Sequence, residues 1–183
     1  MIQTTQLNTF NNQSFNVGAS RIKMMVWYLC NQLFFRSMIH SYQLKIFLLK
    51  IFGAQVGHNV IIKPHVNIKY PWKLIIGNDV WIGESVWIDN LAQVQIGNNV
   101  CISQGAFLLT GNHNYKKSSF DLMIGNIILE DGVWIGAKSI VGPNVICKSH
   151  SVLSVMSFAN KNLESYKIYR GNPAEIIKDR IFE

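Results

Sequence analysis

The amino-acid sequence predicts a mainly β protein built on a parallel β-helix, with helices before it and a short helix after it. Three observations lead to this prediction. Most of the chain repeats every six residues, a segment before the repeat has helical spacing, and one long insertion interrupts the repeat. A six-residue period fits neither an α-helix nor a simple amphipathic strand. Repeated units of this kind indicate a solenoid.

The N-terminal part divides into a polar tail and a helical cap. Residues 1–19 are rich in Asn and Gln and lack the pattern of a signal peptide. Residues 20–55 have helical spacing and no Gly or Pro before Gly53, which predicts helices over 20–36 and 41–52. We expect them to cover the open end of the coil, where strand edges are unpaired. Docking of residues 20–52 on a membrane surface is a second, compatible expectation.

The repeat occupies residues 56–160 and comprises fourteen hexapeptides. Thirteen begin with Ile, Leu or Val, and their fifth position is mostly Val, Ala or Ser. Gly, Asn or Asp at the corners supplies unusual backbone angles. Three hexapeptides make one triangular turn, which predicts four to five coils stacked at about 4.8 Å. The first positions are Val56, Ile62, Ile68, Ile76, Ile82, Ile88, Ile96, Ile102, Leu108, Leu129, Ile135, Val141, Cys147 and Leu153.

One insertion, GNHNYKKSSFDLMIGN at residues 111–126, protrudes from this repeat. Long loops in a strict solenoid are where function usually lies. The insertion contains His113, whose neutral imidazole can take a proton from a hydroxyl group. Tyr115, two residues further, is a candidate contact for a substrate.

Coil stacking predicts which residues lie near the stem of the insertion. Asp89 and Asn90 belong to the coil below and fall about one strand spacing from Leu109 and Thr110. A carboxylate there can orient the imidazole or bind substrate hydroxyls. Glu84, on the same coil, is a weaker candidate.

The C-terminal segment, residues 161–183, begins after the last hexapeptide. Gly171, Asn172 and Pro173 form a turn signal, and residues 174–181 are expected to form a short helix.

Charge and cysteine content limit the class of partner and the compartment. The chain carries 17 Lys and Arg against 10 Asp and Glu, and its first acidic residue is Asp79. This basic front favours an anionic partner: a nucleotide-like cofactor, a membrane surface or nucleic acid. Nucleic acid is disfavoured because the aromatic residues there are not interleaved with cations. Three cysteines without paired spacing favour a reducing cytoplasm and no metal cluster.

Several motifs resemble a known family. The hexapeptides, TGNHNY, EDGVWIGAKSIV and RGNPAEIIK look like those of the hexapeptide-repeat acyltransferases. WYLCNQLFFR, IKPHVNIKYPWKLIIGNDVWIGESVWIDNL and CISQGAFLLTGNHNYKKSSFDL resemble the colanic acid biosynthesis acetyltransferase branch. The resemblance covers roughly residues 20 to 180.

This resemblance implies a left-handed β-helix and a homotrimer with sites between subunits. It implies direct transfer of acetyl from acetyl-CoA to a sugar hydroxyl, in the synthesis of an exopolysaccharide, capsule or other surface glycan. His113 matches the family's general base, and no metal is implied. Trp134, Gly136 and Ala137 would lie along the pantetheine arm. The residues implied at the nucleotide end are Lys161, Arg170, Asn172 and Pro173.

Two departures and several alternatives stand beside this interpretation. Asn114 occupies the place where the family usually has Asp, and SVLSVMSFANKN replaces a Gly/Ala-rich last coil. An N-acetyltransferase of an amino sugar and an antibiotic acetyltransferase of the same fold remain open. A γ-class carbonic anhydrase is disfavoured, because His58, His65 and His150 are poorly spaced for zinc.

Overall fold

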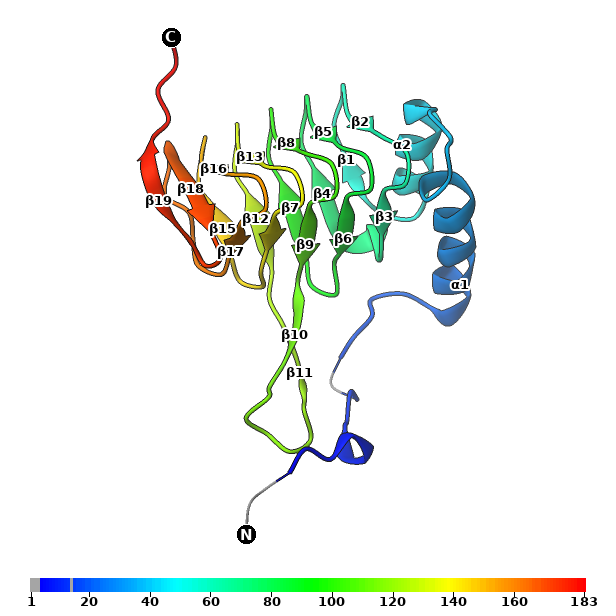
Figure 1. Cartoon of the computed structure of the whole chain (residues 1–183). Coiled ribbons are helices and arrows are strands. Elements are labelled where there is room, and N and C mark those ends of the chain that lie inside the picture. The colour runs from blue at the N-terminus through cyan, green and yellow to red at the C-terminus, as the bar shows by residue number, and fades with distance from the viewer. Residues whose placement is uncertain (1–3, 14) are drawn as a thin grey trace.

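The computed structural model describes residues 4–13 and 15–183 and shows a three-sided coil of parallel strands with two helices at one end (Figure 1). Each coil contributes one short strand to each of three sheets, and five coils are complete. A sixth is begun by Leu163, which bridges to Cys147, and by strand β18. The predicted mainly β solenoid is confirmed, and it extends slightly beyond the four to five coils expected.

The three sides of the coil are called sheets A, B and C. Sheet A contains β1 (Gln55–Val56), β4 (Leu74–Ile76), β7 (Val94–Ile96), β12 (Ile127–Leu129) and β15 (Ile146–Cys147). Sheet B contains β2 (Ile61–Ile62), β5 (Trp81–Ile82), β8 (Cys101–Ile102), β13 (Trp134–Ile135), β16 (Val152–Leu153), β18 (Lys167–Gly171) and β19 (Ala174–Asp179). Sheet C contains β3 (Asn67–Ile68), β6 (Trp87–Asp89), β9 (Phe107–Leu109), β14 (Ile140–Val141) and β17 (Phe158–Ala159).

The six-residue period is explained by the backbone of each hexapeptide. Its first residue points into the core, and all fourteen first positions are buried except Val56, which is half-buried. The fourth residue commonly has a positive φ, as in Asn59 (54°) and Asp79 (57°), where the chain turns from one side to the next. Asn and Asp tolerate this conformation. Met156 adopts it as well (56°), at a cost in backbone energy.

The two N-terminal helices cover the open edge of the first coil. The indole Nε1 of Trp27 donates to the carbonyl oxygen of Ile68 at 2.9 Å. The ammonium of Lys45, which is fully buried, donates to the carbonyl oxygens of Ile62 (3.2 Å) and Lys63 (2.9 Å). These bonds satisfy strand groups that have no neighbouring strand. The helical elements are α1 (Arg21–Cys30), a short π-helix (Asn31–Phe35) and α2 (Tyr42–Ile51).

Two short 3₁₀ turns complete the helical structure, Leu7–Thr9 in the tail and Pro71–Lys73 before β4. Over residues 4–13 and 15–183, no helix combines the length and the apolar character needed to cross a bilayer.

The insertion leaves the coil between sheets C and A and forms a two-stranded hairpin. Strands β10 (Gly111–His113) and β11 (Leu122–Ile124) pair antiparallel, and the hairpin protrudes from the solenoid (Figure 1). The N-terminal tail reaches its tip, where the amide of Gln6 donates to the carbonyl oxygen of Ser118 at 2.8 Å.

The prediction of a short C-terminal helix over residues 174–181 is wrong, because Ala174–Asp179 form strand β19. Strand β19 follows β18 through the turn at Asn172 and Pro173 and pairs with it antiparallel. Strand β18 is the last strand of the parallel coil, so the backbone groups on its outer edge have no partner in a further coil. Strand β19 folds back and pairs with them. Intrinsic helix propensity contributes only a small free energy per residue, so the pairing of β19 with β18 overrides it.

Candidate functional site

His113 is the last residue of β10, the strand that begins at Gly111 where the hairpin leaves the solenoid. Its imidazole Nδ1 is 2.8 Å from the carbonyl oxygen of Phe120, and its ring stacks on that of Phe120 at 4.5 Å between centroids. The ring of Phe10, from the N-terminal tail, lies 5.9 Å away. A carbonyl oxygen can only accept, so Nδ1 carries a proton, and in the neutral imidazole the lone pair is then on Nε2. In this tautomer Nε2 can act as a general base.

The stem of the hairpin rests on the coil that carries Asp89 and Asn90, as the stacking argument expected. The hydroxyl of Thr110, which is fully buried, donates to the carbonyl oxygen of Asp89 at 2.8 Å. The carboxylate of Asp89 pairs with the ammonium of Lys69 at 2.8 Å and is almost fully buried. The amide of Asn90 bonds to the backbone N–H and carbonyl of Tyr70. The structure therefore shows both side chains engaged in holding the coils together.

The other two predicted substrate contacts lie apart from one another. Tyr115 is exposed in the hairpin, two residues beyond His113. Glu84 is exposed at the corner between sheets B and C, one coil below Gln104. The structure brings Tyr115 into the same hairpin as His113 and places Glu84 on another edge of the solenoid.

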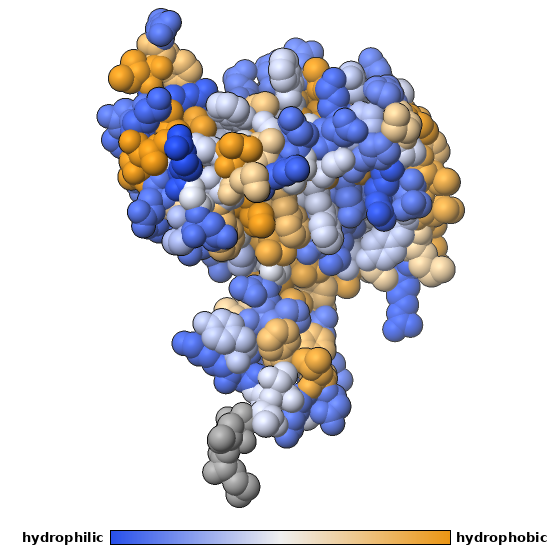
Figure 2. All heavy atoms as spheres, in the orientation of Figure 1, coloured by the Kyte–Doolittle hydropathy of each residue, from blue (hydrophilic) through white to orange (hydrophobic). Residues whose placement is uncertain are grey.

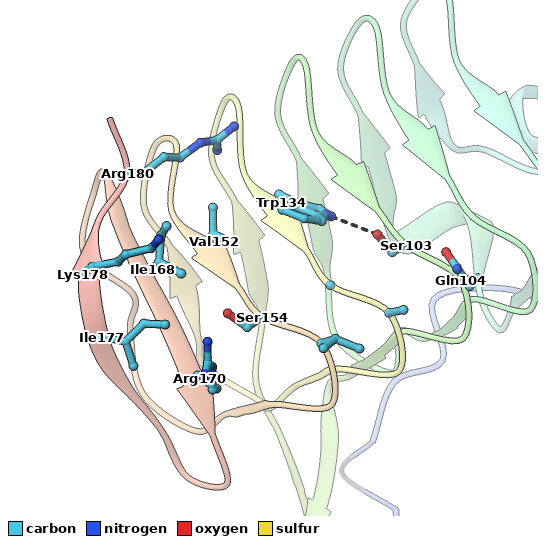
Figure 3. A pocket seen from close by; sticks show the side chains of 13 residues that line it. Ser103, Gln104, Trp134, Val152, Ser154, Ile168, Arg170, Ile177, Lys178 and Arg180 are labelled. Carbon is cyan, nitrogen blue, oxygen red and sulfur yellow. Dashed lines mark hydrogen bonds between the residues drawn. The ribbon is translucent and has the colours of Figure 1, made fainter. Parts of the chain in front are cut away.

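A groove of about 710 Å³ runs along the outer face of sheet B at its C-terminal end. Its floor includes Trp134, whose indole Nε1 donates to the hydroxyl of Ser103 at 2.9 Å (Figure 3). The residues that line it are Ser103, Gln104, Trp134, Gly136, Ala137, Val152, Ser154, Val155, Ile168, Arg170, Ile177, Lys178 and Arg180. Four of them, Trp134, Gly136, Ala137 and Arg170, were predicted to contact acetyl-CoA. This long, largely apolar groove suits an extended pantetheine arm.

Gly136 also has a structural reason to be glycine. A Cβ atom there would lie 2.6 Å from the backbone nitrogen of Val155 and 2.7 Å from the carbonyl oxygen of Leu153. Any larger residue would push the next coil away, so Gly136 allows close stacking beside the groove.

Cations gather at the end of the groove formed by β18 and β19 (Figure 3). Arg170 and Lys178 are exposed. The guanidinium of Arg180 donates to the carbonyl oxygens of Gly132 (2.8 Å) and His150 (3.2 Å), which fixes it in place. Positive side chains at one end of an apolar groove suit the phosphates of a nucleotide.

Three residues predicted at the nucleotide end do not line the groove. Asn172 and Pro173 are exposed in the turn between β18 and β19. Lys161 is exposed between β17 and Leu163, at the corner that joins sheet C to sheet A. Arg170 is the one member of this predicted set that the groove contains.

The imidazole and the groove lie on different edges of the solenoid. The hairpin with His113 leaves between sheets C and A, whereas the groove lies on sheet B and its corner with sheet C. His113 is absent from the residues that line the groove. One copy of the chain therefore does not unite these two parts.

Sequence reasoning missed Lys178, Ile177 and Arg180, because residues 174–181 were expected to be helical. A signal was present: Asn172 and Pro173 separate two runs containing β-branched residues, which is a hairpin pattern. No sequence motif marked Ser103 and Ser154 as groove residues. They line the groove only because strands β8, β13 and β16 stack in register in sheet B.

No metal centre emerges from the described ranges, 4–13 and 15–183: they contain no group of three or more His, Cys, Asp or Glu side chains arranged to hold a metal ion.

Two curated acetyltransferases are similar in sequence to this chain. No protein-family model matches the chain. The chain is 34% identical over 165 residues to WcaF of Escherichia coli strain K12, which is named as a colanic acid biosynthesis acetyltransferase; the match covers 90% of this chain and 91% of WcaF. It is 29% identical over 140 residues to the galactoside O-acetyltransferase of the same organism, covering 72% and 66% of the two chains.

Solved structures show the same fold. A hexapeptide-repeat acetyltransferase of Vibrio cholerae superposes with a TM-score of 0.80 at 20% identity, covering 90% of this chain and 96% of that one. A galactoside acetyltransferase in complex with coenzyme A superposes with a TM-score of 0.77 at 21% identity, covering 87% and 82%.

The coil thus has the architecture of the left-handed β-helix acetyltransferases. The similarity to WcaF extends over nearly the full length of both chains. The chain belongs to the hexapeptide-repeat acetyltransferase family, and within it to the group that includes WcaF.

Proposed function

We propose that this protein is an O-acetyltransferase that moves the acetyl group of acetyl-CoA to a sugar hydroxyl during the synthesis of a surface glycan. The observation that carries the proposal is the tautomer of His113. Its Nδ1 lies 2.8 Å from the Phe120 carbonyl oxygen, which leaves Nε2 of the neutral imidazole available to accept a proton. The relatives named as colanic acid and galactoside acetyltransferases support the choice of acceptor class.

The chemistry follows from what each part can do. Nε2 of His113 takes the proton of the acceptor hydroxyl as its oxygen attacks the thioester carbonyl carbon. The carbon–sulfur bond then breaks, and the imidazolium returns the proton to the departing thiolate. No covalent link to the enzyme is required. The groove on sheet B would hold the pantetheine arm beside Trp134, Gly136 and Ala137, with Arg170 and Lys178 at the phosphates.

The proposal includes a homotrimer, because one chain holds the base and the groove on different edges. Threefold symmetry can place the hairpin of one subunit against the groove of the next. It also includes a cytoplasmic location, supported by three cysteines that are all free.

The test measures thiol release from acetyl-CoA with a panel of sugars and nucleotide-linked sugars. We expect His113→Ala to lower kcat by about 10²-fold or more with the trimer mass unchanged. Treatment of the product with hydroxylamine separates the classes, since an ester is cleaved and an amide persists. An amide product would favour the alternative N-acetyltransferase, and turnover only with an antibiotic would favour an antibiotic acetyltransferase. Wild-type turnover by His113→Ala would refute the proposed base.

A further inference from the structure

Helix α1 and the short π-helix that follows it carry apolar side chains on two faces. The inner face packs against the first coil through Trp27, Cys30 and Phe35, which are buried. The opposite face is apolar too, although it faces solvent. Its members recur at helical spacing, and at least half of each side chain's surface is exposed: Ile22, Met25, Val26, Leu29 and Leu33. We call these five residues the outer face of α1.

This outer face lies at one end of the solenoid. Hydrophobic side chains gather along that edge of the molecule, where α1 and α2 lie (Figure 2). On α2, Phe47 and Ile51 are also largely exposed and lie one helical turn apart. Seven exposed apolar side chains gathered at one end of a single chain indicate an interaction surface.

The charge around the outer face is positive. Arg21, Arg36 and Lys50 are exposed on these helical segments, and none of them belongs to an ion pair among the described residues. No acidic residue precedes Asp79 in the sequence. A second copy docked on this face would bring like charges together, which disfavours self-association. An anionic surface would be attracted.

We propose that the outer face of α1 is a docking surface for an anionic lipid bilayer. The helix lies flat in the interface, with Met25 and Leu29 among the acyl chains and Arg21 and Arg36 beside lipid phosphates. Such a contact needs no spanning helix. It is independent of acetyl transfer and brings the enzyme to acceptors that are held at a membrane.

The experiment mixes the full chain with sucrose-loaded vesicles of equal phosphatidylglycerol and phosphatidylcholine, and with vesicles of phosphatidylcholine alone. We expect wild-type protein to sediment with the anionic vesicles and to be released as salt rises. The double variant Met25→Glu/Leu29→Glu is expected to bind at least about tenfold more weakly. Ile181→Glu is the matched control, since Ile181 is an exposed apolar residue near the C-terminus; its binding should equal wild type.

Three results would overturn the proposal. Wild-type protein could fail to sediment with the anionic vesicles, the double variant could sediment as much as wild type, or Ile181→Glu could lose as much vesicle binding as the double variant. Light scattering tests the rival occupant, because a drop in mass for the double variant would assign the face to contact between copies. Acetyl transfer to a small soluble acceptor should be unchanged in the double variant. This readout keeps failure of docking distinct from failure of the proposed enzyme.

Discussion

The imidazole Nδ1 of His113 donates to the carbonyl oxygen of Phe120 at 2.8 Å, and the two rings lie parallel within 9°. Phe120, in the second half of the hairpin, thus holds the His113 side chain in two ways, by a hydrogen bond from its backbone carbonyl and by stacking of its ring. Both contacts come from Phe120, seven residues further along the chain, so the hairpin orients its own imidazole.

Removing the stacking should therefore slow the reaction without disturbing cofactor binding. Phe120 has a φ of 53°, so Phe120→Asn is the suitable change, because Asn tolerates this conformation. We expect kcat to fall about tenfold and the KM for acetyl-CoA to stay within twofold. Phe120→Tyr keeps the ring and serves as the control. A rise in KM with kcat unchanged would show that the ring acts elsewhere.

Trp134 should contribute to binding of acetyl-CoA. Trp134→Ala removes an apolar part of the groove floor and the partner of Ser103, and we expect the KM for acetyl-CoA to rise about tenfold. The control is Trp87→Ala on sheet C, where an exposed Trp stacks on Phe107 at 4.6 Å, outside the groove. The measurement is the initial rate at varied acetyl-CoA concentration, with the oligomeric mass of each variant compared with that of wild type. Equal KM values for the two variants would contradict a role specific to the groove.

Arg170 and Lys178 should recognise phosphates rather than the acyl chain. We expect Arg170→Met or Lys178→Met to raise the KM for acetyl-CoA about five- to tenfold. Acetyl-pantetheine lacks the nucleotide, so its KM should not change in the same variants. An equal effect on both donors would place these cations at the pantetheine arm instead.

The buried Lys45 should make stability depend on pH. Burial lowers the pKa of this ammonium from 10.5 to about 8. Between those values the unfolded chain binds the extra proton, so the free energy of unfolding rises as pH rises from 8 to 10.5. The rise should be on the order of 2 to 3 kcal/mol.

Urea unfolding at several pH values measures this effect. Burial lowers the pKa of Lys73 as well, so the relevant quantity is the difference between wild type and Lys45→Met. That difference should shift steadily in favour of wild type above pH 8. A constant difference would show that the ammonium titrates alike in both states.

The six-residue period was enough to predict the solenoid, because each hexapeptide places one aliphatic residue inward and one turn residue at a corner. Local reasoning also predicted that the insertion with His113 protrudes from the coil. Trp134, Gly136 and Ala137 came from the family resemblance, and the structure places all three at the groove. Local reasoning failed at residues 174–181, where pairing with β18 rather than local propensity chose the conformation. It also assigned Asn90 to substrate binding, whereas coil stacking commits that amide to the backbone of Tyr70.

By itself, then, the sequence determined the coil and the family, since both depend on residues close together in the chain. Only the tertiary structure decided the tautomer of His113, the cationic end of the groove and the solvent-facing apolar face of α1. The contact of the imidazole forms only when the two halves of the hairpin fold together. The groove and the free face of α1 exist only once segments distant in the sequence have packed against one another.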